Sequence, residues 1–365
     1  MSTKSEILPL TGLRFVAALY VFLFHIEINW PYAPAGIVGK VIAQGAVGMS
    51  VFFVLSGFLL AYQYSGRFED KKTYFVRRIA RIYPIYIVAA LCTIPWAPKL
   101  PALDMTVLVI TDIFVLQAWV PSYFKYWNNG GSWSISVEVF CYAVLPFIVP
   151  WVSKLSNKRL ACFSVILYIL TVVPGQAASI FPSVSFSFFY ALPLFRLPEF
   201  LLGVCGFLVM QRGFRFSRPT LLFIFILIAF VVCIRVRQAG PPYIDYNWMV
   251  VPVVACLVMS LCQSNWFLPW LLSSKPFVWL GKISYCFYSF QALVLLTLIT
   301  YHTELIRVFP VLGINWVLCV VAFVVLLFLS VIGHHLIEEP CRKIIQNWAD
   351  SARGERIKNE RVHSA

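Results

Sequence analysis

Long apolar segments separated by short polar loops follow one another along almost the whole chain. The apolar segments cover residues 8–28, 44–63, 83–98, 133–152, 160–175, 187–210, 219–236, 247–262, 276–300 and 315–337. Each is 16 to 25 residues long, about the length that an α-helix needs to cross the hydrocarbon core of a bilayer. The pattern therefore predicts an all-α fold, a polytopic membrane bundle of about ten transmembrane helices.

A weaker apolar stretch lies at residues 104–120. If it does not cross and the N-terminus is cytoplasmic, twenty Lys and Arg residues fall in the cytoplasmic loops and tail, and six in the opposite loops. Cytoplasmic loops carry the excess of basic residues in membrane proteins, so we expect both termini to be cytoplasmic. A full crossing at 104–120 would invert every later loop, and we therefore expect this segment to be re-entrant or to lie on the outer surface.

The composition agrees with a membrane protein, since 61% of the residues are hydrophobic and 12% are charged. The net charge of +14 comes from the basic loops, and no basic patch with interleaved aromatic residues predicts a nucleic-acid partner. The ten cysteines lie almost all inside or beside apolar segments without a CxxC pair, which is typical of core residues rather than of disulfides or a metal site. We expect one transmembrane domain, 1–340, whose first apolar segment is retained, and a short charged cytoplasmic tail, 341–365.

Arg14 and His25 stand eleven residues apart in the first apolar segment. In a helix, this spacing closes to within roughly 20° of three full turns and separates the residues by about 16 Å along the axis, so both lie on one stripe at different depths. Ionisable residues inside a membrane usually face a cavity or the bundle interior. The pair therefore predicts a polar conduit, and the alternative is two unrelated side chains that extend to the membrane surface.

Arg78 and Arg81 lie three residues apart, close to the start of the third apolar segment. Two guanidinium groups at this spacing share one helical face and can grip the phosphate groups of a nucleotide-bearing donor. A contact with anionic lipid, or a topological signal, is the alternative.

Ser134 and Glu138 stand four residues apart at the start of the fourth segment, hence on one helical face. Because the outer ends of the first and fourth segments lie at one level, we expect Glu138 and His25 to meet in one cavity. A carboxylate beside an imidazole would then orient it as a general base. The alternative for Glu138 is a polar contact between helices. The other histidines are dispersed, in an outer loop, near the inner end of the last apolar segment and in the tail, which argues against a multi-histidine metal site.

Arg196 and Glu199, three residues apart in the sixth segment, form a second intramembrane charge pair. Two interpretations are equally compatible with the sequence. The pair could bind the hydroxyl groups of an acceptor, or it could neutralise itself as a buried ion pair.

Taken together, these residues resemble the acyltransferase-3 family of integral membrane acyltransferases, many of them O-acetyltransferases of bacterial surface sugars. The matching pieces are Arg14 with His25, the run Phe52–Phe58, Arg78 with Arg81, Ser134 with Glu138, Glu199–Gly203, Gly281–Tyr288 and Glu339–Pro340. The resemblance covers nearly the whole chain. One departure is Gln291, at a place where members often carry a histidine.

The resemblance implies acetyl-CoA as donor on the cytoplasmic side of a bacterial inner membrane, with no metal. The implied acceptor is a sugar hydroxyl of an exopolysaccharide, O-antigen or other lipid-linked glycan on the periplasmic side. His25 would be the general base, Arg78, Arg81 and Arg14 would bind and guide the donor, and Ser134 is a weaker candidate as acyl carrier. The loss of histidine at Gln291 leaves His25 as the main candidate base.

Two alternatives stay open from the sequence. A transporter or flippase could use the polar stripe, although the paired halves common in transporters are not visible as an internal repeat. Within the acyltransferases, the acyl group could be other than acetyl, or the acceptor could be a small molecule.

Overall fold

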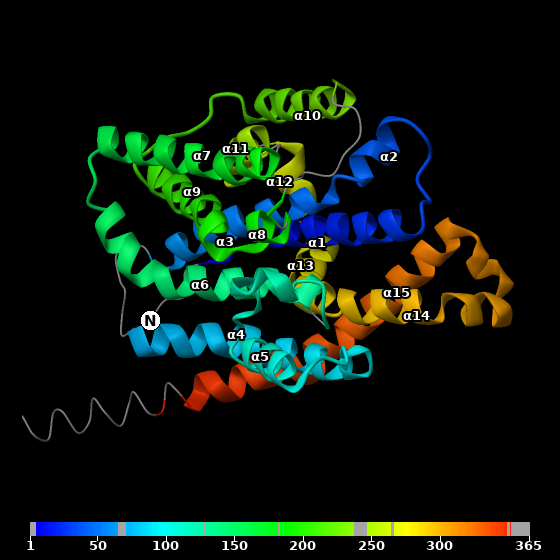
Figure 1. Ribbon diagram of the computed structural model, residues 1–365. Helices are drawn as coiled ribbons and strands as arrows, with labels where there is room; N and C mark the ends of the chain where they lie inside the picture. The colour runs from blue at the N-terminus through cyan, green and yellow to red at the C-terminus, as the bar shows by residue number, and fades with distance from the viewer. Residues whose placement is uncertain are drawn as a thin grey trace, which may run out of the picture.

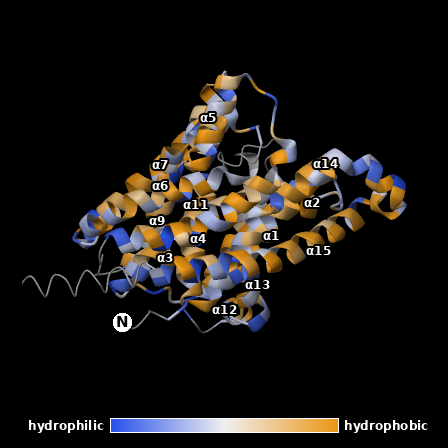
Figure 2. Cartoon of the chain, turned by 90° about the horizontal axis from the view of Figure 1, so that it is seen from below, coloured by the Kyte–Doolittle hydropathy of each residue, from blue (hydrophilic) through white to orange (hydrophobic). Residues whose placement is uncertain are grey.

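The computed structural model describes residues 5–64, 71–127, 129–181, 183–184, 186–236, 247–263, 266–348 and 351, and in these ranges it contains helices and no strand. Six stretches are long and apolar enough to span a membrane: Leu8–Asn29, Ile37–Tyr64, Gly131–Val152, Asn157–Ile180, Ser187–Gln211 and Asn315–Trp348. The hydrophilic residues gather mainly at helix ends and in loops (Figure 2). The fold is therefore an all-α bundle with membrane-spanning helices.

Each expected apolar segment is largely helical, although 187–210 and 276–300 are each divided between two helices. The helices are α1 (Leu8–Asn29), α2 (Ile37–Ile42), α3 (Gly48–Tyr64), α4 (Lys71–Cys92), α5 (Ala102–Ile113), α6 (Asn129–Val152), α7 (Asn157–Ile180), α8 (Phe186–Ala191), α9 (Pro193–Gln211), α10 (Pro219–Val236), α11 (Asn247–Leu261), α12 (Phe267–Leu272), α13 (Lys275–Ser289), α14 (Gln291–Val308) and α15 (Asn315–Gly333). In Figure 1, the axes of α1, α4, α6 and α7 lie roughly parallel to one another, and α6 runs opposite to α1.

The sequence predicts about ten crossings. In the described residues, fewer helices are long and apolar enough to cross a membrane. Six stretches qualify, and seven if α13 and α14, which meet at a 50° bend, count as one span. The remaining expected spans fall on α4, α10 and α11. α4 begins at Lys71 and so carries the basic residues that we placed before the span, while α11 has only 15 residues.

The weak apolar stretch forms α5 followed by two short 3-10 turns, Gln117–Trp119 and Pro121–Tyr123. The 12 residues of α5 extend about 18 Å, which is too short to cross a hydrocarbon core of about 30 Å. At the other end of the chain, helical structure continues past residue 340 as far as Trp348. Residues 349–350 and 352–365 of the expected tail lie outside the described residues.

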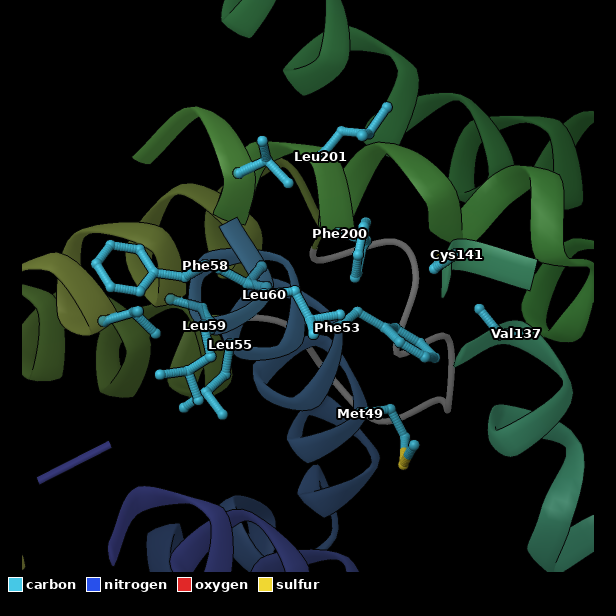
Figure 3. Close-up of a cluster of buried hydrophobic side chains, with 14 of the residues drawn as sticks. Met49, Phe53, Leu55, Phe58, Leu59, Leu60, Val137, Cys141, Phe200 and Leu201 are labelled. Atoms are coloured by element: carbon cyan, nitrogen blue, oxygen red, sulfur yellow. The ribbon is translucent and has the colours of Figure 1, made fainter. Parts of the chain in front are cut away.

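The centre of the bundle is the contact between α3 and α9. A Cβ atom on Gly57 would overlap the carbonyl oxygen of Phe200, and one on Gly203 would overlap that of Val54. Because glycine lets backbones approach closely, the side chains beside these positions interdigitate. Figure 3 shows Phe58 and Leu60 of α3 beside Phe200 and Leu201 of α9, with Val137 and Cys141 of α6 at the edge.

A second close contact joins α1 to α13 and determines where Arg14 lies. A Cβ atom on Gly281 would overlap the carbonyl oxygen of Thr11. Phe287 packs edge-on against Phe15 and Phe22, with ring centroids 5.5 and 5.8 Å apart. The α1 stripe that carries Arg14 and His25 therefore runs along α13 and the start of α14.

Candidate active site

A polar cavity of about 610 Å³ opens at the end of the bundle where α1 begins. Its wall comes from the start of α1, the end of α3, α4, α13 and the helical stretch after α15. The basic residues in this wall are Arg14, Arg77, Arg78, Arg81, Lys282 and Arg342. Three acidic residues, Glu6, Glu338 and Glu339, also line it. The volume lies within the range of small-molecule and cofactor sites, and the excess of cations favours an anionic ligand.

Arg78 lies among three tyrosine rings at the wall of this cavity. Its guanidinium carbon is 5.7 Å from the ring centroid of Tyr64, 5.9 Å from that of Tyr74 and 5.7 Å from that of Tyr142. Nη2 donates to the hydroxyl of Tyr64 at 3.3 Å. Nε and Nη1 have no hydrogen-bond partner among the residues that the structure describes. Since such donors are costly to leave unsatisfied, this side chain is suited to a ligand with anionic oxygens.

A smaller cavity, about 60 Å³, adjoins the first one deeper in the bundle. Arg14, Arg81, Ser284 and Tyr285 line both. The deeper wall adds Ser56, Ser134, Glu138 and Tyr288. The two predicted motifs, Arg78 with Arg81 and Ser134 with Glu138, thus line two adjoining cavities, and Arg14 belongs to the wall of both.

Glu138 of α6 lines the small cavity together with Arg14 and Arg81. Its Oε1 accepts a hydrogen bond from Ser56 Oγ at 3.1 Å and one from the hydroxyl of Tyr142. Its carboxylate also interacts electrostatically with Arg14 and Arg81. This is a polar contact between helices, the alternative that the sequence left open.

The structure does not join Glu138 to His25, contrary to our expectation. Glu138 lines the small cavity and contacts Ser56 and Tyr142. Instead, Nδ1 of the half-buried His25 lies 3.3 Å from Oε1 of Gln291.

The hydroxyl groups of Ser134 and Tyr288 lie 2.7 Å apart. Both residues line the small cavity, whereas His25 lines neither cavity. Tyr288 and Gln291 are three residues apart across the bend between α13 and α14. One turn of chain therefore separates the cavity wall from the His25 contact.

Arg196 and Glu199 lie elsewhere, on α9, where Arg196 stands over the rings of Phe53, Trp133 and Tyr190. Their side chains pair at 2.6 Å and are 2% and 0% exposed as residues. Asn247 donates to Glu199 Oε1 at 3.2 Å, and Arg196 Nε donates to the carbonyl oxygen of Tyr190. Neither charge lines the two cavities, which favours a self-neutralised ion pair over an acceptor site.

Comparison with known proteins identifies the family of this chain. A family model described as "Acyltransferase domain" matches residues 8–335. The chain belongs to the acyltransferase-3 family. As a member it is an acyltransferase enzyme.

This acyltransferase is 30% identical to "Acyltransferase MdmB" of Streptomyces mycarofaciens over 300 residues, which cover 76% of each chain. It is 26% identical to "Putative peptidoglycan O-acetyltransferase YrhL" of Bacillus subtilis over 91% of this chain and 54% of that relative. It is 24% identical to "Putative acetyltransferase ORF330" of Acidianus two-tailed virus, over 77% of this chain and 81% of that protein. No solved structure matches.

Sequence reasoning missed several residues of the candidate site. Ser56, Ser284, Tyr285 and Tyr288 line the small cavity. All four lie in the two family motifs Phe52–Phe58 and Gly281–Tyr288. The signal was therefore present, but a hydroxyl within an apolar motif does not by itself show which way it points.

A second unexpected group lies at the wall of the large cavity, where a π-helical turn, His334–Glu338, follows α15. Glu338 Oε2 accepts from Cys286 Sγ at 3.1 Å and lies 2.9 Å from His334 Nδ1. These three ligand atoms lie within 4.8 Å of one another, close enough to hold a metal ion. Cys286 and His334 already satisfy this carboxylate oxygen by hydrogen bonding. In this acyltransferase the cluster can therefore also be explained as a buried polar contact without a metal ion.

Proposed function

We propose that this protein transfers an acetyl group from acetyl-CoA to a sugar hydroxyl of an exopolysaccharide, O-antigen or other lipid-linked glycan. The observation that carries the proposal is the guanidinium-lined cavity that continues inward past Arg14 and Arg81. The family supports acyl transfer, and the name of the Bacillus subtilis relative supports acetyl transfer to a glycan.

The donor binds in the large cavity. Arg78 and Arg81 hold phosphate groups of coenzyme A, because guanidinium groups match phosphate oxygens in charge and geometry. Two nitrogens of Arg78 lack partners among the described residues and lie ready for these contacts. The pantetheine arm then extends past Arg14 into the small cavity, toward the hydroxyl pair of Ser134 and Tyr288.

His25 is the general base. It takes the proton of the acceptor hydroxyl as that oxygen attacks the carbonyl carbon of the thioester. The new C–O bond forms, the C–S bond breaks, and the coenzyme A thiolate leaves and receives the proton from the imidazolium. Because one turn of chain lies between His25 and the small cavity, the arm reaches His25 only when the Ser134–Tyr288 contact opens. Acyl transfer through Ser134 is the second route.

The proposed topology follows from the same arrangement. We infer ten crossings, in which α4, α10, α11 and the bent α13–α14 pair join the six long stretches. Both termini then lie in the cytoplasm of a bacterium, together with the large cavity, and the chain lies in the inner membrane. His25, near the far end of α1, lies toward the periplasmic acceptor.

The test is acetyl transfer by purified protein in detergent, given radiolabelled acetyl-CoA and the glycan of the host. We expect labelled sugar from the wild type and from His363→Ala, and a loss of at least a hundredfold from His25→Ala, as is usual when a general base is removed. A folded His25→Ala protein with unchanged rate would remove the base from the mechanism. Product formed only with another acyl-CoA, or with a small-molecule acceptor, would replace the substrates and keep the enzyme class.

A further inference from the structure

Gln291 stands at the bend between α13 and α14, on the face that meets α1. It is the first residue of α14, and the two helices meet at 50°. The residue is 2% exposed. Its amide nitrogen, Nε2, donates to the backbone carbonyl oxygen of Ala18 at 3.2 Å. The bend thus turns a polar side chain toward the α1 stripe that carries His25.

The contact with Ala18 determines which way the amide faces. A carbonyl oxygen only accepts hydrogen bonds, so the NH2 group of Gln291 must lie on that side and Oε1 on the other. Oε1 lies 3.3 Å from Nδ1 of His25. An amide oxygen also only accepts, and therefore Nδ1 of His25 must carry the hydrogen. In a neutral imidazole, this leaves the lone pair on Nε2.

We propose that Gln291 is a positioning residue that holds His25 as the Nδ1–H tautomer and presents Nε2 as the basic atom. The use of that atom as base depends on the proposed function, whereas the tautomer does not. Glu138 does not provide this orientation, because it contacts Ser56 and Tyr142 and has no contact with His25 in the described part of the chain. A neutral amide orients the ring without adding a charge inside the membrane, where an extra charge is costly.

The first test determines which ring nitrogen of His25 carries the hydrogen. Protein labelled with ¹⁵N-histidine is studied by NMR in detergent at a pH at which His25 is neutral, and the His25 signal is assigned by its loss in His25→Ala. We expect the protonated nitrogen to be Nδ1 in the wild type and the ring to become a mixture of tautomers in Gln291→Met, which has almost the same shape but cannot accept at Nδ1. A wild-type ring protonated on Nε2 overturns the proposal.

A matched control separates orientation from general loss of stability. Gln117 is also 2% exposed, and its Nε2 also donates hydrogen bonds, to the carbonyl oxygen and the hydroxyl of Ser132. Gln117→Met therefore removes a buried amide of the same kind away from His25. We expect its His25 signal to match the wild type. If Gln117→Met alters the tautomer as Gln291→Met does, the effect is structural and the proposal fails.

The second test measures kcat and the KM for acetyl-CoA. We expect Gln291→Met to lower kcat by about tenfold to a hundredfold, a typical loss when a group that orients a functional imidazole is removed, with unchanged KM for acetyl-CoA. The same kcat in Gln291→Met and wild type would show that the orientation has no role in the reaction. If His25→Ala is fully active while the wild-type ring carries its hydrogen on Nδ1, the proposed function fails and the tautomer assignment stands.

Discussion

At the scale of single residues, the polar side chains of the candidate site differ in how many hydrogen-bond partners they have within the protein. Glu138 has donors from Ser56 and Tyr142 and lies near two arginines. Arg78, only a few residues along α4 from Arg81, has tyrosine rings around it and two nitrogens without a described partner. A buried polar group without a partner costs free energy unless a ligand supplies one. Arg78 is therefore the residue at which donor binding is best tested.

We predict that Arg78→Gln and Arg81→Gln each weaken coenzyme A binding by about tenfold to a hundredfold, the equivalent of one or two hydrogen bonds between charged groups. Arg78→Lys restores only part of the affinity, because an ammonium group cannot form two parallel N–H contacts. Isothermal titration of the purified protein with coenzyme A measures the dissociation constants.

Arg212→Gln is the control for this prediction. Arg212 binds Asn157 and the carbonyl oxygens of Ser153 and Leu155, and it does not line the cavity. Its replacement leaves the affinity unchanged. If both Arg78→Gln and Arg81→Gln bind coenzyme A as the wild type does, these arginines do not hold the donor.

At the scale of elements, small residues and one ion pair determine how the helices meet. Gly57 and Gly203 bring α3 and α9 into backbone contact, and Gly281 does the same for α13 and α1. The pair of Arg196 and Glu199 then joins α9 to α11 through Asn247. Breaking a buried pair is costly, because the remaining charge has no compensation, whereas replacing both partners by apolar residues is often neutral.

We therefore predict that Arg196→Met or Glu199→Met alone destabilises the protein by about 3–5 kcal/mol. The double variant regains most of that stability and keeps the KM for the acceptor. Thermal unfolding in detergent and acetyl-transfer assays measure the two quantities. A double variant that is as stable as the wild type but has a strongly raised acceptor KM would instead make this pair an acceptor site.

At the scale of the whole molecule, the arrangement of helices gives the two ends of α1 different surroundings. The large cavity and its cations surround the beginning of α1, and His25 lies close to the other end. Under the proposed function, the donor binds at one membrane surface and the acceptor at the other. This separation is meaningful only if the two ends of α1 lie on opposite sides of the bilayer.

We predict that the loop after α1 and the loop between α6 and α7 lie on opposite sides, the former periplasmic and the latter cytoplasmic. Ala35→Cys and Lys154→Cys, both at exposed positions, are made in a background in which the exposed Cys92 and Cys162 are serine. A membrane-impermeant thiol reagent added to intact spheroplasts should label Ala35→Cys and leave Lys154→Cys unlabelled, and lysis should expose both. Labelling of Lys154→Cys before lysis contradicts the orientation.

Much of the fold could be predicted from local properties. Each expected apolar segment is largely helical, because the length and hydropathy of a membrane helix depend on consecutive residues. The number of crossings was less predictable. α4 shows why, since its basic first turns and apolar second half form one helix, and a search for uninterrupted apolar residues divides it.

In the candidate site, too, some features follow from the sequence and others only from the tertiary structure. By itself, the sequence determined the helical stripe of Arg14 and His25, the spacing of Arg78 with Arg81 and of Ser134 with Glu138, and the family, because these depend on residues near one another in the chain. Only the tertiary structure decided that His25 meets Gln291, 266 residues away, and that Glu138 meets Ser56 instead. The physical reason is that these contacts join different helices, whose relative positions along their axes are not encoded in either segment alone. Helical periodicity gives a side chain its direction around an axis, but which partner lies at its level depends on how far packed helices slide past one another.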